Sequence, residues 1–345
     1  MKSVSLSDIA ERLGISKYSV SRALTGKPGV SDATRRRVLR VAQEMGYVHP
    51  ALEQRPTDPG ERTVVVLIPL QDLDDAEFWM GVIGGTISAA AQLGYTIATR
   101  AIDSADDGTR VSRHIVQGVI VAGSKARSAL PPYLEAGVPA SLITYPTPLE
   151  PFDAVHAADW EGGAMVAKHL ADLGHVRLGY VTEGPERPSF AARARGFRDA
   201  AAGERGVDVV EMHIDGDEPG LSFERAYAAL ADEDRAPTGI LASTDSIAFA
   251  IAAALGRLGL EVPRDMSLVG FNDAVGSSRF VPKLTTLRIA TGDIGAAAMR
   301  FLHERIEGSR TPARRLELAP TFVLRDSTAA VRAKAVRSAG LEVGR

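Results

Sequence analysis

The sequence predicts an α/β protein in which a small head of three helices precedes a core of two doubly wound units with parallel sheets. Three observations lead to this fold class. The first 49 residues contain three short amphipathic segments, each preceded by a capping residue. From residue 62 to 327, short apolar runs alternate with amphipathic segments of helical period. Between them, residues 49–61 (HPALEQRPTDPGE) carry three prolines in thirteen residues, which indicates a linker.

The three helices of the head each have their own boundary signals. Ser5, Ser16 and Ser31 precede them as N-caps, and Gly14 and Gly46 end the first and the third. The second helix is expected to run from residue 17 to about residue 24. The inward apolar positions are Leu6, Ile9, Ala10 and Leu13, then Val20, Ala23 and Leu24, then Val38, Val41, Ala42 and Met45.

The first two helices have the pattern of a helix-turn-helix. Ala10 is small enough for the helices to cross closely, and Gly14 tolerates the positive φ of a tight turn. Residues 1–49 carry nine Lys and Arg against four Asp and Glu, a net charge of +5, whereas the other 296 residues have a net charge of −8. This asymmetry favours a head that binds nucleic acid. Generic three-helix packing and chance clustering of charge are the alternatives.

The core elements follow in alternation. Aliphatic and β-branched runs predict buried strands, and amphipathic segments predict helices on both faces of parallel sheets. About 265 residues are more than one such unit needs, so two are expected. The expected strands are residues 63–70, 95–102, 118–123, 139–145, 177–184, 208–214, 238–245 and 266–273. The expected helices are residues 78–94, 110–116, 160–174, 193–206, 223–233, 246–259 and 292–308.

Specific runs of the head, "DIAERLGIS", "VSRAL", "VSDATRRRV" and "MGY", resemble the headpiece of the LacI/GalR family of bacterial transcription regulators. The resemblance continues through "DWEGGAMVAKHLADLGHVRLGYVTEG", "STDSIAFAIAAALGRLGLEVPRDMSLVGFND" and "PKLTTLRI". It implies a core similar to type I periplasmic sugar-binding proteins, in which a ligand binds between two subdomains. Three crossovers near Asp159, Arg288 and Pro320 would join these subdomains.

This resemblance gives a domain plan. The head is residues 1–49, the Pro-rich linker 50–61, the core 62–327 and a flexible tail 328–345. Within the core, the N-subdomain is expected at residues 62–158 and 289–319, and the C-subdomain at residues 159–288 and 320–327. The tail lacks a sustained leucine heptad, so no tetramer is predicted.

In the family, the second helix of the head lies in the major groove. Carried over by position, Lys17, Tyr18 and Arg22 are expected at base edges, where Arg can form a bidentate pair with guanine. The residues expected at backbone phosphates are Ser5, Ser16, Ser21, Lys27 and Thr34. The family also implies a homodimer on a pseudo-palindromic double-stranded operator.

The linker departs from the family pattern. Pro50 stands where asparagine is usual, Glu53 and Gln54 replace an Ala-Arg pair, and Pro56 replaces the leucine that wedges into the minor groove. Leu52 can act as a wedge only from a shifted register, and the charge of Glu53 beside phosphates opposes this. We therefore expect less operator bending than in relatives with the full hinge.

Nine side chains near the carboxyl ends of predicted strands are candidates for ligand contacts. The resemblance implies effector contacts for Arg193, Thr244 and Asn272, although the family often has Asn and Asp at the last two positions. Aromatic faces with hydrogen-bonding groups suit a sugar or a nucleoside. The full set is Phe78, Trp79, Tyr145, Phe190, Arg193, Thr244, Asp245, Asn272 and Asp273.

These assignments have structural alternatives. Phe78 and Trp79 suit core packing, and Arg193 suits an ion pair with Asp245 or Asp273.

No pattern indicates an enzyme. The chain lacks G-x-x-x-x-G-K-[ST], G-x-S-x-G and H-E-x-x-H, and no G-x-G-x-x-G follows the first strand. With no cysteine and seven scattered histidines, no metal or cofactor is expected. The start of the chain has no signal-peptide pattern, so we expect a cytoplasmic protein. An enzyme or a secreted sugar-binding protein on the same core is the alternative from a different class.

Taken together, the motifs predict a homodimeric transcription regulator, in particular a repressor, that responds to a sugar or sugar derivative. A regulator of this family without a small effector is the alternative.

Overall fold

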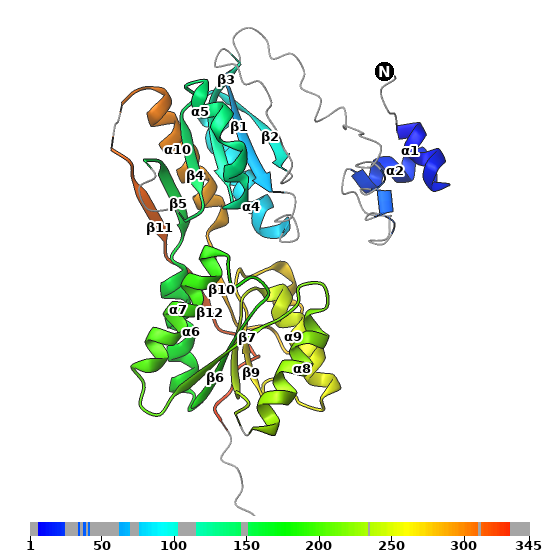
Figure 1. Ribbon diagram of the computed structural model, residues 1–345, viewed down its shortest axis with the longest axis vertical. Helices are drawn as coiled ribbons and strands as arrows, with labels where there is room; N and C mark the ends of the chain where they lie inside the picture. The colour runs from blue at the N-terminus through cyan, green and yellow to red at the C-terminus, as the bar shows by residue number, and fades with distance from the viewer. Residues whose placement is uncertain are drawn as a thin grey trace, which may run out of the picture. The chain divides into compact units, whose positions relative to one another are not determined.

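The computed structural model forms two compact units, residues 1–61 and 62–345 (Figure 1). The residues that it describes are 6–24, 34, 37–38, 41, 62–69, 76–102, 115–145, 151–233, 235–309 and 312–331. The linker, with Leu52, lies outside them. No helix in these ranges is long and apolar enough to cross a membrane.

The first unit contains α1 (Leu6–Leu13) and α2 (Lys17–Leu24), in agreement with the predicted helices. The turn between them contains Gly14 at a φ of 64°. The hydroxyl oxygen of Ser16 accepts a hydrogen bond from the backbone N–H of Ser19 at 3.1 Å, so the expected N-cap of α2 is present. Residues 34, 37, 38 and 41 are also helical. The described core consists of Ile9, Ala10, Val20 and Val38. The caps expected at Ser5 and Ser31 lie outside the described residues.

The first half of the larger unit is built on a six-stranded parallel sheet in the order β11-β5-β4-β3-β1-β2. Its strands are β1 (Arg62–Pro69), β2 (Tyr95–Ile102), β3 (Val116–Ala122), β4 (Ala140–Ile143), β5 (Asp153–Ala157) and β11 (Arg315–Leu318). Alternate β1 residues face opposite sides, so Val66 packs with α4 (Ala76–Gln92) and α10 (Thr291–Ile306). Leu67 packs in the other cluster, with η2 (Lys125–Ala129) and the residues around α5 (Pro131–Glu135).

The second half has a four-stranded parallel sheet in the order β7-β6-β8-β9. Its strands are β6 (Arg177–Thr182), β7 (Asp208–His213), β8 (Gly239–Ala242) and β9 (Ser267–Val269). One face is covered by α6 (Asp159–Asp172) and α7 (Pro188–Ala202), and the other by α8 (Pro219–Asp232) and α9 (Asp245–Arg257). Tyr180 and Val181 on β6 point into these two clusters, respectively. The predicted fold class, two doubly wound parallel sheets, is confirmed.

Helices α6 and α7 approach each other at glycines. A Cβ added to Gly196 would lie 1.9 Å from the carbonyl oxygen of Trp160, and one added to Gly163 would lie 2.1 Å from that of Arg193. Any side chain at these positions would separate the helices. The two glycines therefore set the spacing between the helices that carry Asp159 and Arg193.

The chain crosses between the two halves three times (Figure 1). The first crossing is Ala158, between β5 and α6, and the second is residues 289–290, between β10 (Thr286–Arg288) and α10. The third is residues 319–320, between β11 and β12 (Thr321–Val323). Strands β10 and β12 pair antiparallel beside the crossings.

Some elements differ from the predictions. Strands β5, β10, β11 and β12 were not predicted, because runs of three to five residues give little periodicity. Helix α7 begins at Pro188, five residues earlier than expected, since proline is well accommodated in the first turn. Most of the helix expected at residues 110–116 lies outside the described residues, but residue 116 begins β3.

The start of the expected flexible tail is packed against the second half. The backbone N–H of Ala329 donates to the Ser267 hydroxyl at 3.0 Å, and that of Val331 donates to the Leu173 carbonyl at 3.0 Å. Residues 328–331 therefore belong to the core, and the prediction of a tail beginning at residue 328 was wrong there. The sequence pattern did not reveal this packing, because the backbone groups bond to residues at the end of α6 and on β9 that are far away in the sequence.

Candidate ligand-binding site

A cavity lies between the two halves of the larger unit and takes residues from both. The first half contributes the start of α4 and the carboxyl ends of β3, β4 and β5, and the second contributes the starts of α6 and α7. This is where open parallel sheets bind ligands. The lining residues are Phe78, Trp79, Gly123, Ser124, Lys125, Ile143, Thr144, Tyr145, Val155, His156, Ala157, Asp159, Arg187, Pro188, Ser189, Phe190, Arg193, Asn272, Ile289 and Ile294.

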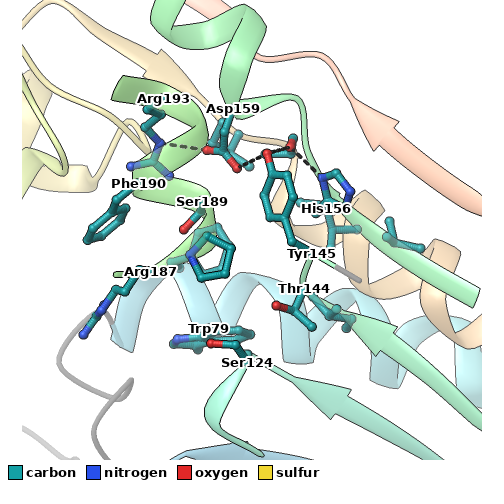
Figure 2. A pocket seen from close by; sticks show the side chains of 18 of the residues that line it. Trp79, Ser124, Thr144, Tyr145, His156, Asp159, Arg187, Ser189, Phe190 and Arg193 are labelled. Carbon is teal, nitrogen blue, oxygen red and sulfur yellow. Dashed lines mark hydrogen bonds and ion pairs between the residues drawn. The ribbon is translucent and has the colours of Figure 1, made fainter. Parts of the chain in front are cut away.

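A buried cluster of Arg193, Asp159 and Tyr145 forms one end of the cavity (Figure 2). The guanidinium Nε of Arg193 donates to Asp159 Oδ1 at 2.7 Å, and the Tyr145 hydroxyl donates to Asp159 Oδ2 at 3.0 Å. Arg193 also donates to the Ser243 carbonyl. Tyr145 follows β4, whereas Asp159 begins α6, so the hydroxyl-to-carboxylate bond joins the two halves across the first crossing.

Burial controls the protonation of this cluster. Desolvation raises the pKa of the Asp159 carboxyl, and the charge of Arg193 opposes this rise. Burial, followed by the negative charge of Asp159, raises the pKa of Tyr145 far above its usual range. The phenol therefore stays protonated and donates a hydrogen bond to the carboxylate. The arrangement is a satisfied acid–base pair with a neutral hydrogen-bond donor at its side.

Arg193 is held by aromatic rings as well as by its ion pair. Its guanidinium carbon lies 3.6 Å from the Phe271 ring centroid and 5.0 Å from that of Phe190, and the residue is only 5% exposed. Arg193 does form an ion pair, as the structural alternative expected, but the partner of Arg193 is Asp159 and not Asp245 or Asp273.

Aromatic side chains form the opposite wall. Phe78 and Trp79 meet edge to face with ring centroids 5.1 Å apart, and Trp79 is part of the buried core. Both also line the cavity, so core packing and a position at the cavity occur together. Tyr145 stacks on His156 with ring centroids 3.9 Å apart.

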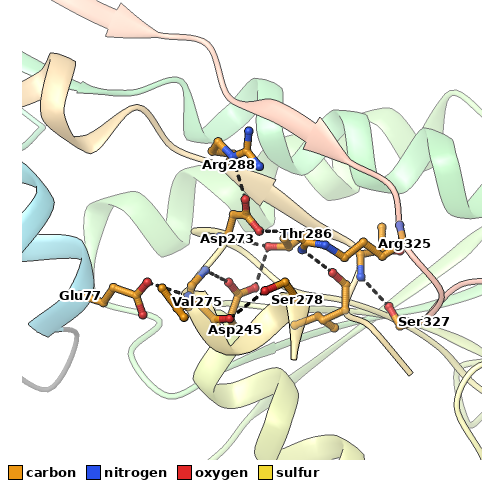
Figure 3. A network of polar contacts seen from close by, with 12 residues as sticks. Glu77, Asp245, Asp273, Val275, Ser278, Thr286, Arg288, Arg325 and Ser327 are labelled. Carbon is orange, nitrogen blue, oxygen red and sulfur yellow. Dashed lines mark hydrogen bonds and ion pairs between the residues drawn. The ribbon is translucent and has the colours of Figure 1, made fainter. Parts of the chain in front are cut away.

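Six of the nine predicted ligand-contact candidates line the cavity: Phe78, Trp79, Tyr145, Phe190, Arg193 and Asn272. The other three are not among the lining residues, and Asp245 and Asp273 belong to a neighbouring polar network (Figure 3). Thr244 caps α9 by accepting from the Ile247 N–H at 3.3 Å. Asp273 binds Arg288 at 2.7 Å and Arg325 at 2.6 Å.

Asp245 is a buried member of this network. Its carboxylate accepts from the Ala274 N–H and from the Thr286 hydroxyl, both at 2.6 Å. Desolvation raises its pKa to about 6. Asp245 and Asp273 therefore hold the loop after β9, Thr244 caps α9, and none of the three is among the residues that line the cavity.

In the head, the start of α2 is open to solvent. Tyr18 is 68% exposed, Lys17 is exposed, and the Arg22 guanidinium lies 5.2 Å from the Tyr18 ring centroid. Thr34 is half-buried in the third helical segment. Of the expected phosphate contacts, Ser5 and Lys27 lie outside the described residues, and only the backbone of Ser21 is described.

Two family models match the chain: "Bacterial regulatory proteins, lacI family" over residues 5–50 and "Periplasmic binding protein-like domain" over residues 167–328. The HTH-type transcriptional regulator MalR of Streptomyces coelicolor is 31% identical in an alignment of 343 residues that covers 94% of this chain and 96% of MalR. The chain belongs to the lacI family of bacterial regulatory proteins. It is thus a DNA-binding transcription regulator and not an enzyme.

Solved structures share the fold of this lacI-family chain. The transcriptional regulator CelR in complex with cellobiose has a TM-score of 0.66 at 24% identity, covering 94% of this chain and 99% of that one. The lac repressor dimer bound to operator and the anti-inducer ONPF has a TM-score of 0.65 at 22% identity, covering 95% and 100%.

Several cavity residues of this lacI-family core were not among the predicted candidates. Asp159, His156, Ser124, Arg187 and Ser189 all line it. Ser124 and Arg187 follow predicted strands, so the search for ligand contacts at the carboxyl ends of strands could have included them. Asp159 could have been found only from its contact with Arg193, 34 positions away. Within the described residues, no group of three or more His, Asp or Glu is placed to hold a metal ion.

Proposed function

We propose that this lacI-family regulator is a repressor whose affinity for its operator is controlled by a carbohydrate bound in the cavity between the two halves. The observation that carries the proposal is a cavity with aromatic faces on both sides and hydroxyl groups between them. Trp79 and Phe190 offer flat apolar surfaces, and Ser124, Thr144 and Ser189 offer hydrogen-bonding groups. Pockets with apolar walls and a few polar groups suit a sugar ring. CelR, bound to cellobiose, has the same fold.

Control of DNA binding follows from the position of the cavity. A ligand that contacts both halves stabilises one relative arrangement of them. The difference between its affinities for the two arrangements determines how far the affinity for DNA can change. The Tyr145 to Asp159 bond lies at the first crossing, where a rotation would act. Because Tyr145 and Asp159 both join the halves and line the cavity, a ligand in the cavity can affect the rotation through them.

DNA reading would come from α2. Lys17, Tyr18 and Arg22 are proposed for base edges, and the exposure of Tyr18 and Lys17 supports this. The Ser16 hydroxyl caps α2 through its oxygen and lies 2.9 Å from the Ser19 hydroxyl, and it is proposed for a phosphate contact.

A homodimer is part of the proposal, since one head reads one half-site. The outer face of α4 supports it. Met80 and Ile87 are 65% and 48% exposed, and Gly84 lies between them in the sequence, with no atom of a described residue within 4 Å of an added Cβ. This apolar stripe at helical spacing suits burial against a second copy. The lac repressor of the same fold is a dimer on its operator.

The dimer is tested by Ile87→Glu, which places a charge in the proposed contact. Sedimentation should show a monomer with much weaker operator binding, while Met165→Glu, at an exposed position on α6, should remain dimeric. A dimer that persists in Ile87→Glu would remove α4 from the interface.

The main test selects genomic fragments that bind the full-length chain and then titrates carbohydrates against the chosen operator. We expect a pseudo-palindromic site and a carbohydrate that changes operator affinity at least tenfold, about 1.4 kcal/mol of coupling. The same carbohydrate should raise the melting temperature of the free protein. A broad carbohydrate panel with no effect on either quantity would instead support a regulator without a small ligand.

A further inference from the structure

The chain enters the core at the edge of the first sheet that lies opposite the cavity. Arg62 and Tyr95 are the first residues of β1 and β2, and they face each other in the parallel register. The cavity lies at the carboxyl ends of β3, β4 and β5, and all these strands run in the same direction. Arg62 directly follows Glu61, the last residue of the first unit. The linker therefore joins the core at the amino-terminal edge of this sheet.

Four side chains form a polar cluster at this edge, which we call the Arg62 cluster: Arg62, Tyr95, His303 and Glu307. The Arg62 guanidinium donates to the Tyr95 hydroxyl at 2.5 Å and to the Glu307 carboxylate, and its carbon lies 4.2 Å from the Tyr95 ring centroid. The Tyr95 hydroxyl also lies 3.1 Å from His303 Nδ1. Tyr95 is only 5% exposed, so a buried ring fixes the position of the arginine side chain.

Helix α10 connects the Arg62 cluster to the cavity. It begins directly after the second crossing, and Ile289 in that crossing and Ile294 near the start of the helix both line the cavity. His303 lies in the last turn of α10, and Glu307 is its C-cap residue. Sixteen helical residues span about 24 Å. A single helix thus reaches from the cavity to the side chain of the first core residue (Figure 1).

Helix α4 packs so closely against α10 that the two helices form one rigid pair. A Cβ added to Gly85 would lie 1.9 Å from the Gly292 carbonyl oxygen, and one added to Gly295 would lie 2.0 Å from that of Val82. Backbones in direct contact at these positions leave no side chains between them that could repack. Helix α4 also begins at the cavity, and two residues separate its end from Tyr95. Both helices therefore run from the cavity to the Arg62 cluster.

We infer that α10 and the Arg62 cluster transmit the effect of a ligand in the cavity to the linker. This inference rests on the proposed function and adds the route within one subunit. A ligand that rotates the halves acts on the start of α10 at the second crossing. Because α10 and α4 form a rigid pair, the displacement reaches Glu307, and the bond from Arg62 passes it to the residue that follows the linker. Arg62 and Glu307 are positioning residues, and neither is among the residues that line the cavity.

The test separates carbohydrate binding from its effect on the operator. The full-length protein is titrated by calorimetry with glucose, galactose, mannose, ribose and cellobiose, and operator affinity is measured with and without each. One carbohydrate should change the operator affinity of the wild type at least tenfold. Arg62→Met and Glu307→Ala should each bind this carbohydrate within about twofold of wild type, while the change in operator affinity falls to about threefold or less.

Two further variants control for charge and stability. Exchange of the pair, Arg62→Glu with Glu307→Arg, restores opposite charges at the same positions and should recover most of the operator response. Arg257→Met breaks another exposed Arg–Glu ion pair, with Glu224 in the second half, and should respond like the wild type.

Three results would count against the inference. A wild-type operator response in both Arg62→Met and Glu307→Ala would overturn it and leave the proposed function intact. Carbohydrate binding that weakens in step with the operator response would also overturn it, because the cluster would then act on binding and not on transmission. If none of the carbohydrates changed the operator affinity of the wild type, the proposed function and this inference would both be overturned.

Discussion

The Glu77 carboxylate accepts a hydrogen bond from the backbone N–H of Val275 at 2.7 Å, and the two residues belong to different halves of the core (Figure 3). Glu77 lies in the first turn of α4, and Val275 begins η3 (Val275–Ser278). Both residues are exposed, so water competes for the bond and its net contribution is about 1 kcal/mol. A contact of this size can hold one arrangement of the halves and still yield to a ligand.

Glu77→Ala should expose the Val275 amide. Without its acceptor, this N–H should exchange with solvent hydrogen up to about tenfold faster in the ligand-free protein. Residue-resolved hydrogen exchange is the measurement, and Glu77→Gln, which keeps a carbonyl oxygen in place, is the control. Equal exchange in the wild type and the alanine variant would show that the bond does not protect this amide.

Asp245→Asn should change how stability depends on pH. Because burial raises the pKa of Asp245 from about 3.8 to about 6, the unfolded chain ionises first as the pH rises. The wild type should therefore lose about 3 kcal/mol of unfolding free energy relative to the variant between about pH 4 and pH 7. Urea unfolding across this range tests it, with the exposed Asp217→Asn as control. A constant difference between wild type and Asp245→Asn would contradict the shifted pKa.

Gly196→Ala should separate α6 from α7. The added Cβ would lie 1.9 Å from the Trp160 carbonyl oxygen, and overpacking of this kind costs about 1–3 kcal/mol. The separation should also weaken the bond between Asp159 and Arg193. Thermal unfolding should show a lower melting temperature than wild type.

Gly256→Ala is the matched control. It lies in helix α9, and none of the residues that the structure describes comes within 4 Å of an added Cβ, so the substitution should be neutral or stabilising by up to about 1 kcal/mol. If both variants had equal stability, close packing at Gly196 would not be the cause.

Arg22→Ala should weaken specific operator binding by about 1–3 kcal/mol and relax the preference at one base position. Its guanidinium stands beside the exposed Tyr18 on α2. Sequencing of fragments bound from a randomised operator library reports both effects. A binding profile identical to wild type would exclude a base contact, whereas a uniform loss across all sequences would indicate a phosphate contact.

Local patterns in the sequence predicted most of the fold. The continuous apolar runs of β1 and β6 follow from burial on both faces of a sheet, and the Ser16 cap depends on a residue only three positions away. The short strands β10 and β12 were not predictable, because they exist only as each other's partners. Their pairing joins residues more than thirty positions apart, which no local period reveals.

Part of the candidate site was predicted from the expectation that ligands bind at the carboxyl ends of parallel strands. This expectation identified Trp79, Tyr145 and Phe190, because parallel strands bring their carboxyl ends to one edge of the sheet. It could not show which polar side chains at that edge point away from the cavity. Asp245 stands at such an end, yet it turns to the Ala274 N–H and the Thr286 hydroxyl, and these long-range bonds appear only in the folded chain.

The three crossings also determine the order in which the halves can be completed during synthesis. Strands β6 to β9 and helices α6 to α9 all lie within residues 159–269, so the second sheet is whole before the ribosome reaches α10. The first sheet must wait for β11, at residues 315–318, and until then β5 is an open edge. From residue 269 to residue 318 the nascent chain therefore carries an unfinished sheet beside a finished one, and this interval is where mispairing and chaperone binding should concentrate.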